Sequence, residues 1–402
     1  MLHSYSFSNY RSFRDQVDVS FELTDKDAVT GWAQHSRISN QRLSTALAVL
    51  GANASGKTSL IQPLAFLAWF LKHSFQSAPN SGIPVWTHFA DEAGACSFEV
   101  VADGPEADTF LRYLLRVTPT RVLAESLEKK LKRGQWKMIF DRREGLDGKT
   151  HVIQDGLDLD DTQAQNVRPN VSLVSWAAQF GVPLAKALLN FNLFTNIYVG
   201  GRLFSSYEDL VSTCATYYES NPASKGRMRD LLSSWDLGLS DIAFKKNEAP
   251  QVPPLAGAAP QPNWIAQGIH IDAEGNNYAI PLWQESEGTR SALALLTVVL
   301  PVLEQGGVIV YDQLDSDLHP HMLTSVLELF ADRHSNPKAA QIIFTCHTVE
   351  ILRILQKSQI VLVEKDKLES QAWRLDSVEG VRSDENRVAK YLAGAYGAVP
   401  RM

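Results

Sequence analysis

The sequence is poor in cysteine and has no apolar run long enough to cross a membrane. Its three cysteines, Cys96, Cys214 and Cys346, show neither the spacing of zinc ligands nor a disulfide pattern. The longest apolar segment, ALALLTVVLPVL, is too short for a transmembrane helix and contains Pro301. The N-terminus lacks the basic start and apolar stretch of a secretory signal. We therefore expect a cytoplasmic protein without a membrane partner.

An excess of basic residues is also missing. The net charge is -7 at pH 7, and the 21% of charged residues is ordinary for a globular protein. A generally nucleic-acid-binding surface is not favoured, although a local basic groove is compatible with this charge. The basic segment EKKLKRGQWK is interpreted either as a solvated hairpin face or as a contact to a phosphate backbone. The acidic run LDLDD, near Asp155, predicts a solvated loop rather than the metal site of a nuclease.

The sequence does contain an alternation of strand and helix patterns at both ends of the chain. This alternation predicts an α/β fold with a mainly parallel sheet covered by helices. The middle of the chain lacks it, and a Pro/Ala-rich loop at residues 251–263 precedes its return. We predict one nucleotide-binding core that is split by an insertion. The expected parts are residues 1–120, an insertion at 121–265 with a hairpin and mainly helices, and residues 266–402.

One short segment has the pattern of a phosphate-binding loop. GANASGKT, residues 51–58, follows the apolar strand STALAVL and opens a helix. Its glycines allow backbone N–H groups to wrap phosphates, and the helix N-terminus adds a positive field. In such a loop Lys57 reaches the β- and γ-phosphates, and the Thr58 hydroxyl binds Mg²⁺. An ordinary glycine-bearing turn is the alternative, and the combination of lysine, threonine, strand and helix argues against it.

Two later strands deliver polar residues to the same kind of site. VIVYD is an apolar strand that ends in Asp312, which we expect to hold Mg²⁺ through water. The strand IIFTCH ends in His347, where a side chain could sense the γ-phosphate. A histidine after a strand is often only structural, but the order of the strands favours the functional interpretation.

A second helix start lies between the phosphate loop and the Asp312 strand. In ESEGTRSALALL, Ser286 and the backbone at Gly288 form a Ser-x-Gly turn that could bind phosphate. One site does not need two such helix starts for the same γ-phosphate. Two chains that face each other do need them, because each lends its turn to the ATP of the other. Taken alone, SEGT also fits a simple helix cap.

Together these motifs resemble the ABC-type ATPases related to SMC and RecF. The segment FSNYRSF resembles the F-x-N-[FY]-R-S-F start of that group. The tail DENRVAKYLAGAYGAVP is similar to the end of one subset, the small AAA-family ATPases of prokaryotic abortive-infection and anti-phage modules, including RloA-like proteins. The resemblance covers both ends of the chain and the middle only loosely. It implies a P-loop NTPase of the ABC-type head class, with an N-terminal antiparallel β portion and a mainly helical insertion.

The resemblance also implies a set of site residues and two cofactors, ATP and Mg²⁺. Thr58 and Asp312 are the implied Mg²⁺ ligands, and Asp312, Gln313 and His347 are the implied catalytic positions. Arg11 is expected near the nucleotide, and residues 315–319 in a loop between protomers. The residues implied to bind the triphosphate are Gly51, Asn53, Gly56, Lys57, Thr58 and Ser59. Those implied to contact the ATP of the opposing protomer are Ser286, Gly288 and Thr289. The glutamine by which these families link the γ-phosphate to the insertion has no convincing counterpart.

Gln313 departs from the family, which has glutamate at this position. The family's glutamate polarises the attacking water, and a glutamine cannot act as a carboxylate base. We interpret Gln313 as an engineered Glu→Gln change that traps the ATP-bound dimer. A natural non-hydrolysing switch is one alternative, and a different catalytic base is another.

The resulting hypothesis is an ATPase that dimerises around two Mg-ATP and acts as a sensor or scaffold in anti-phage defence. Its expected partners are a second copy or a larger oligomer, an effector encoded nearby (a nuclease or toxin), and a nucleic-acid or phage-derived trigger. The alternatives are a RecF/SMC-like DNA-binding repair ATPase and a nucleotide-gated interaction protein without turnover. Salt-sensitive DNA binding by the isolated protein would favour the repair ATPase.

Overall fold

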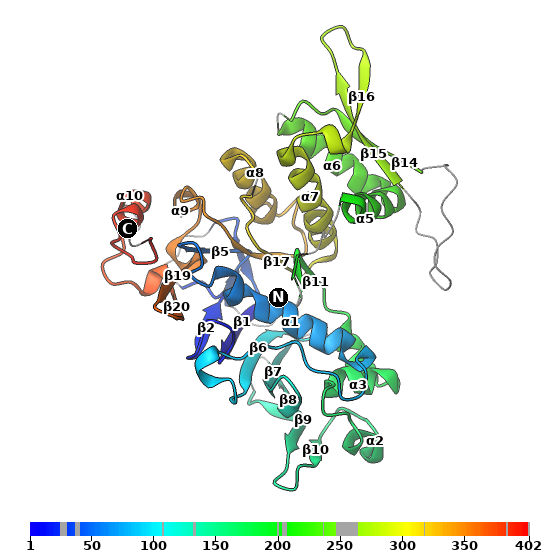
Figure 1. Ribbon diagram of the computed structural model, residues 1–402, viewed down its shortest axis with the longest axis vertical. Coiled ribbons are helices and arrows are strands. Elements are labelled where there is room, and N and C mark those ends of the chain that lie inside the picture. The colour runs from blue at the N-terminus through cyan, green and yellow to red at the C-terminus, as the bar shows by residue number, and fades with distance from the viewer. Residues whose placement is uncertain are drawn as a thin grey trace.

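Two large sheets with a helix between them form the centre of the protein (Figure 1). The computed structural model describes residues 1–24, 30–36, 41–106, 108–131, 134–198, 201–202, 207–235, 237–246, 264–316, 318–382 and 385–400. The Pro/Ala-rich loop predicted at residues 251–263 lies outside the described residues, as do residues 132–133 of the basic segment.

The first sheet is the predicted core, with strand order β11-β17-β18-β5-β19-β20. All its neighbouring strands are parallel except the last pair, β19 and β20, which is antiparallel. Its strands are β5 (Ala46–Gly51), β11 (Leu193–Thr195), β17 (Val308–Tyr311), β18 (Gln341–Thr345), β19 (Ile360–Asp366) and β20 (Glu369–Arg374). Because parallel strands share one carboxyl edge, the residues after β5, β17 and β18 meet there.

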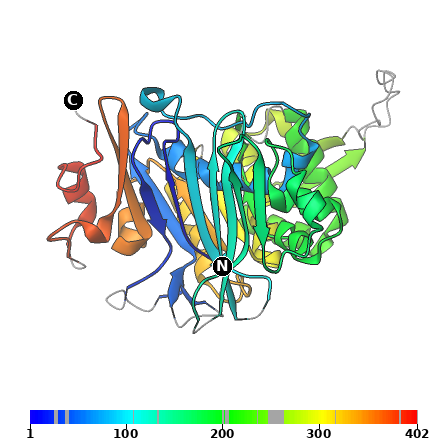
Figure 2. The same cartoon turned by 90° about the horizontal axis from the view of Figure 1, so that it is seen from below.

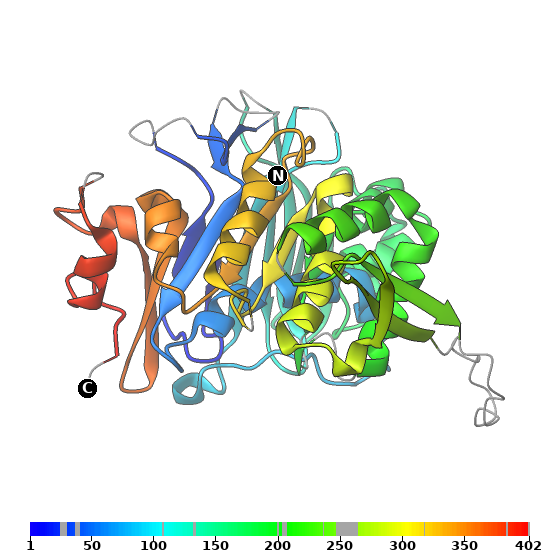
Figure 3. The ribbon, with the colours of Figure 1, turned by 90° about the horizontal axis from the view of Figure 1, so that it is seen from above.

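Both faces of this sheet are buried, which explains the continuous apolar character of its strands. On β5, Leu47 and Val49 face helix α1 (Lys57–His73), while Ala48 and Leu50 face the opposite layer. That opposite layer contains helices α7 (Glu287–Gln305) and α8 (Pro320–Ala331), which Figure 3 shows from their own side. Helix α9 (Ile351–Ile354) is shorter than the pattern VEILRILQK predicts, because the chain turns at Lys357–Gln359 to enter β19.

The second sheet is antiparallel and covers the other side of α1 (Figure 2). Its strand order is β10-β9-β8-β7-β6-β1-β2. The strands are β1 (Leu2–Ser8), β2 (Val17–Ser20), β6 (Cys96–Asp103), β7 (Thr109–Val117), β8 (Val122–Leu131), β9 (Lys137–Glu144) and β10 (Thr150–Gln154). The part of the chain expected as an insertion therefore begins inside this sheet, because β8 pairs directly with β7.

A fully buried ion pair attaches the neighbouring helix to this sheet. Arg142 on β9 lies 3.1 Å from Glu125 on β8, and each residue is 1% exposed. Glu125 also accepts hydrogen bonds from the Ser172 hydroxyl and the Leu173 N–H, at the start of helix α3 (Leu173–Gln179). Because both charges have several hydrogen-bond partners, the pair fixes where α3 meets the sheet.

The middle of the chain is mainly helical after β10. Its helices are α2 (Asp161–Gln165), α3, α4 (Pro183–Leu189), α5 (Tyr207–Ser220) and α6 (Pro222–Ser234). The sequence patterns do not predict the three-stranded sheet of β14 (Asp241–Lys246), β15 (Trp264–Ile271) and β16 (Asn277–Pro281), which lies beside α5 and α6 (Figure 1). Smaller elements are β3 (Ala33–His35), β4 (Arg42–Ser44), β12 (Ile197–Tyr198), β13 (Gly201–Arg202) and α10 (Arg387–Leu392).

The predicted α/β class, with a mainly parallel core sheet and an N-terminal antiparallel portion, is confirmed. In the described part of the chain, no helix combines the length and apolar character that a membrane span requires. The division of the chain into residues 1–120, 121–265 and 266–402 stays a prediction.

Candidate functional site

The loop between β5 and α1 lies at the carboxyl edge of the core sheet. Gly56 precedes α1 with φ of 112°, a left-handed backbone that favours glycine. A Cβ at this position would lie 2.5 Å from the Ser370 hydroxyl, so the close packing also requires glycine. Among the described residues no side chain caps the first turn of α1, and the turn itself contains no acidic residue. Its N–H groups are therefore available to an anion.

Lys57 lies inside this loop and donates to the loop's own backbone. Its Nζ is 2.9 Å from the Gly51 carbonyl oxygen and 2.8 Å from that of Ala52. The residue is 7% exposed, and burial lowers the pKa of its ammonium group. The positive charge is thus held at the loop without an ion pair among the described residues.

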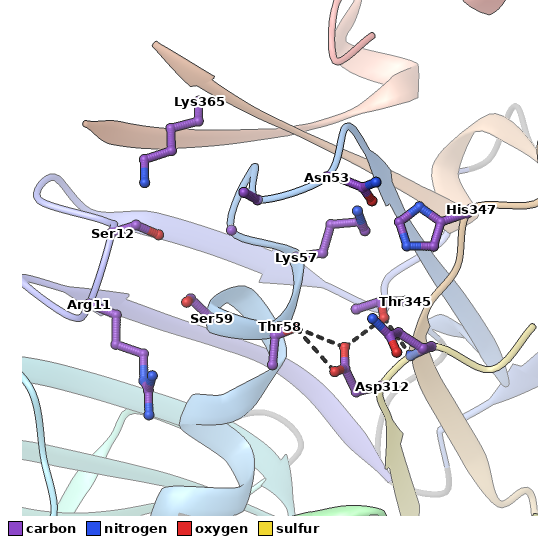
Figure 4. A pocket seen from close by; sticks show the side chains of 13 residues that line it. Arg11, Ser12, Asn53, Lys57, Thr58, Ser59, Asp312, Thr345, His347 and Lys365 are labelled. Atoms are coloured by element: carbon purple, nitrogen blue, oxygen red, sulfur yellow. Dashed lines mark hydrogen bonds between the residues drawn. The ribbon is translucent and has the colours of Figure 1, made fainter. Parts of the chain in front are cut away.

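The Asp312 carboxylate lies directly opposite the start of α1. Its oxygens are 3.0 and 3.1 Å from the Thr58 hydroxyl, and Oδ1 accepts a 2.7 Å hydrogen bond from the Thr345 hydroxyl (Figure 4). Asp312 is 6% exposed and Thr345 is fully buried. Three segments, α1, β17 and β18, therefore fix one carboxylate at one place.

Gln313 follows Asp312 with a left-handed backbone, at φ of 55°. Glutamine rarely adopts this conformation, and such residues concentrate at functional sites. The Gln313 N–H donates to the Thr345 hydroxyl at 2.7 Å, so Thr345 holds both Asp312 and its neighbour. Sequence patterns do not identify Thr345, although it stands two residues before His347.

These residues surround a cavity of about 380 Å³ (Figure 4). It contains most of the predicted site residues, together with Ser12, Thr345 and Lys365, which sequence reasoning misses. The lining residues are Arg11, Ser12, Asn53, Ala54, Gly56, Lys57, Thr58, Ser59, Asp312, Gln313, Thr345, His347 and Lys365. Gly51 contributes its carbonyl to Lys57 from just outside this lining.

The two ends of the cavity differ in chemistry. Asp312 and His347 lie at one end, whereas Arg11, Ser12 and Lys365 lie at the other (Figure 4). The Arg11 guanidinium stacks 4.5 Å above the ring of Trp86. In a P-loop the lysine and the following threonine mark the β- and γ-phosphates. The Asp312 end therefore suits the terminal phosphate, and the Arg11 end suits the rest of a nucleotide.

The predicted loop at residues 315–319 contacts the segment that carries His347. Asp315 Oδ2 accepts hydrogen bonds from the N–H groups of His347 and Thr348, at 2.7 and 2.8 Å, and from the Thr348 hydroxyl. The exposed His319 caps α8 by accepting from the His321 N–H. Asp317, within this loop, lies outside the described residues.

The Ser-x-Gly turn begins α7 and does not line the cavity. The Ser286 hydroxyl accepts a 3.1 Å hydrogen bond from the Thr289 N–H, so it acts as a helix cap within this chain. Gly288 lies in the first turn of the same helix. Contacts of these residues with the ATP of an opposing protomer stay a prediction.

Several hydrogen bonds hold the phosphate-binding loop from behind. The Ser370 hydroxyl on β20 donates to the Ser55 carbonyl at 2.7 Å and lies 2.8 Å from the Ser12 hydroxyl. The Ser370 N–H donates to the Ser12 carbonyl at 2.7 Å. The N-terminal turn, β20 and the loop are thus joined at one buried serine.

We expect Ser370→Ala to lower the free energy of unfolding by about 1 kcal/mol, because the Ser55 carbonyl loses its partner. The variant should also weaken nucleotide binding slightly, since the loop is less well held. Ser377→Ala is the matched control, because the Ser377 hydroxyl donates to the Arg374 main-chain carbonyl at an exposed site on the same chain segment. Thermal unfolding of both variants measures the difference, and equal melting temperatures would contradict it.

The donor set suits Mg²⁺ bound together with phosphate. Mg²⁺ is usually held by one or two carboxylates, hydroxyl or water oxygens and substrate phosphates. The Thr58 hydroxyl and the Asp312 carboxylate provide such oxygens side by side. Within the described ranges no group of three or more His, Cys, Asp or Glu could hold a metal, so the acidic run near Asp155 forms no such cluster. Asp160 in that run caps α2 instead.

Comparison with known proteins finds a family model that covers well over half of the chain. A family model described as "AAA domain, putative AbiEii toxin, Type IV TA system" matches residues 47–185 and 202–353. The search of curated proteins returned no match.

Three solved structures are similar at low identity. An Smc head bound to the C-winged helix domain of ScpA has a TM-score of 0.45 and 13% identity, over 92% of this chain and 96% of that chain. The SMC head domain from Thermotoga maritima has a TM-score of 0.41 and 11% identity, over 93% and 98%. An Smc head with an extended coiled coil, bound to the C-terminal domain of ScpA derived from Pyrococcus furiosus, has a TM-score of 0.39 and 10% identity, over 93% and 96%.

Proposed function

The chain belongs to the AAA domain family whose model spans well over half of it, and from that premise we propose that it is an ATPase that dimerises around two Mg-ATP. One observation carries this proposal. The cavity at the carboxyl edge of the core sheet brings together the uncapped start of α1, the Lys57 ammonium and the Asp312 carboxylate. This combination of positive groups and one metal-binding carboxylate is what a triphosphate with Mg²⁺ requires.

In the proposed complex the phosphates lie on the N–H groups of the loop and of the first turn of α1. Lys57 leaves the carbonyl oxygens of Gly51 and Ala52 and donates to the β- and γ-phosphates instead. Thr58 and Asp312 would hold Mg²⁺, which would supply charge neutralisation for the phosphates. Gln313, which directly follows Asp312, and His347 line the same cavity, where the attacking water and the γ-phosphate would lie.

Dimerisation is proposed because the Ser-x-Gly turn at the α7 N-terminus lies outside the cavity of its own chain, where it would be available to the phosphates of a second copy. A second copy would bring its Ser286, Gly288 and Thr289 to the open side of the first copy's ATP. Closure then depends on ATP in both cavities, and opening follows its loss.

ATP is therefore expected to convert a monomer into a dimer. Analytical ultracentrifugation with and without Mg-ATP measures the mass, and calorimetry measures binding. Ser286→Arg should abolish the ATP-dependent dimer while leaving ATP binding to the monomer intact. The large side chain would obstruct only the Ser-x-Gly turn that contacts the ATP of the other protomer. Ser220→Arg, at the exposed end of α5, is the control and should dimerise normally. No ATP binding would refute the ATPase, whereas binding without a change in mass would refute the sandwich.

We propose in addition that this ATPase serves as the sensor or scaffold of an anti-phage system and controls a partner effector. The family description, which names the AbiEii toxin and a type IV toxin–antitoxin system, supports the link to a toxin. The RloA-like tail motif supports the same assignment. ATP-dependent capture of the protein encoded beside this chain would identify the effector. Salt-sensitive DNA binding by the ATP-loaded protein alone would instead favour the repair ATPase.

A further inference from the structure

Asn196 lies next to Asp312, whose carboxylate is proposed to bind Mg²⁺. It directly follows β11, the edge strand that pairs in parallel with β17. Its side-chain Oδ1 accepts a hydrogen bond from the Asp312 N–H at 2.7 Å, and its Nδ2 donates to the Asp312 carbonyl at 2.8 Å. One side chain thus bonds both main-chain groups of the same residue, as a neighbouring strand would.

The two hydrogen bonds from Asn196 reach the main chain at the point where strand β17 ends. Strand β17 stops at Tyr311, and the left-handed backbone of Gln313 prevents the extended ladder from continuing. The Asp312 carboxylate is aimed by the Thr58 and Thr345 hydroxyls. Its main chain is held from the opposite side by Asn196. A carboxylate on a loose backbone would lose the alignment that a metal ligand needs.

We propose that Asn196 is a positioning residue for the metal site, because it fixes the main chain from which the Asp312 carboxylate reaches Mg²⁺. An asparagine suits this task since its amide combines a donor and an acceptor at the required spacing. An aspartate in its place would lack the donor, and a longer glutamine would displace the pair. This inference rests on the proposed function, since it assumes that Asp312 binds a cation with ATP.

The chain offers a matched control at the other end of the same strand. Asn192 precedes β11 and its Nδ2 donates to the Gly306 carbonyl at 3.2 Å. Both asparagines are half-buried and both bond a main-chain carbonyl of the neighbouring segment. They differ in place, because Asn192 lies at the amino end of the sheet and Asn196 at the edge that carries the cavity. A purely structural role predicts the same behaviour for both.

The experiment uses the full chain with Mn²⁺ as the probe metal. ATP affinity is measured by calorimetry in EDTA and at rising Mn²⁺, and bound Mn²⁺ is followed by electron paramagnetic resonance. Asn196→Ala should raise the half-saturating Mn²⁺ concentration by about tenfold or more, the usual effect of removing a group that orients a ligand. Its ATP affinity in EDTA should stay within about twofold, because the P-loop is intact. Asn192→Ala should leave both values unchanged, although each variant loses thermal stability.

Asn196→Asp provides a second variant of nearly identical size. It keeps an acceptor for the Asp312 N–H and loses only the donor to the Asp312 carbonyl. Its added negative charge would attract Mn²⁺, so a rise in the half-saturating concentration can come only from lost alignment. A shift no larger than that of Asn192→Ala in both Asn196 variants would overturn the inference and leave the proposed function standing. Failure of the unaltered chain to bind ATP would instead refute the proposed function.

Discussion

Gln313→Glu is expected to increase the rate of phosphate release from ATP by about 10²–10⁴-fold, the usual contribution of a general base. The Gln313 backbone is held by the Thr345 hydroxyl, and its side chain lines the cavity beside Asp312 and His347. The substitution exchanges one amide nitrogen for oxygen, so the geometry is retained. The introduced carboxylate can accept the proton of the attacking water, which the amide cannot.

The change should also alter the lifetime of the proposed dimer. With glutamine, ATP is bound but turned over slowly, so the ATP-loaded dimer should persist for long times. With the carboxylate restored, the dimer should dissociate as ATP is consumed. A phosphate-release assay and size analysis over the same time course measure both effects.

Gln371→Glu is the control for this experiment, since it makes the same chemical change at an exposed position on β20. It should leave phosphate release at the starting level. If Gln313→Glu shows no gain, the trapped-enzyme interpretation is wrong, and a non-hydrolysing switch or a different base takes its place. A gain shows that the rest of the catalytic machinery is intact.

The elements around the cavity could be predicted because each has its own local signal. The buried strand before Gly51, the helix after it and the apolar strand ending at Asp312 are marked by continuous apolar residues and by glycine. The sheet of β14–β16 has no comparable signal. Its strands are partly exposed, and no sequence pattern predicts that β14 pairs with β15.

The supporting residues of the site depend on contacts between distant parts of the chain. Asn196 meets Asp312 across 116 residues, and Ser370 meets the Ser55 carbonyl across 315 residues. Asparagine and serine are common in loops, so neither residue stands out in a sequence. The left-handed backbone of Gln313 is equally hidden, because glutamine has no preference for it. Motifs therefore predict the groups that would contact the ligand, whereas the groups that hold them require the fold.

Lys57→Met is expected to weaken ATP binding and to leave the ATP-free protein at least as stable as the unaltered protein. The ammonium is buried, its pKa is lowered by that burial, and its hydrogen bonds go to two neutral carbonyls. A desolvated cation without an ion pair costs stability, which bound phosphates would recover. Methionine has a similar length and no charge. The variant should lose about 2–5 kcal/mol of ATP-binding free energy, which corresponds to a weakening by about 30- to 5,000-fold.

The free energy of unfolding of the ATP-free variant should equal or exceed that of the unaltered protein. The pH dependence provides a second measure. Because the pKa of Lys57 is lower in the folded state than in the unfolded state, the unfolded chain binds more protons between those two values. Stability of the unaltered protein should therefore rise with pH from the lowered pKa towards about 10.4, the value for an exposed lysine. This part of the rise should be absent from Lys57→Met.

Lys365→Met separates the buried cation from an exposed one in the same cavity. Lys365 is solvent-exposed on β19 and lines the end of the cavity away from Asp312. An exposed charge contributes little, so its removal should weaken ATP binding by less than about tenfold. Calorimetry with ATP and denaturant unfolding without ATP test both variants.

If Lys57→Met retains ATP affinity within a few-fold, the cavity is not a triphosphate site. If it instead lowers ATP-free stability clearly below that of Lys365→Met, the buried ammonium stabilises the loop, and the argument that ATP recovers its cost is wrong.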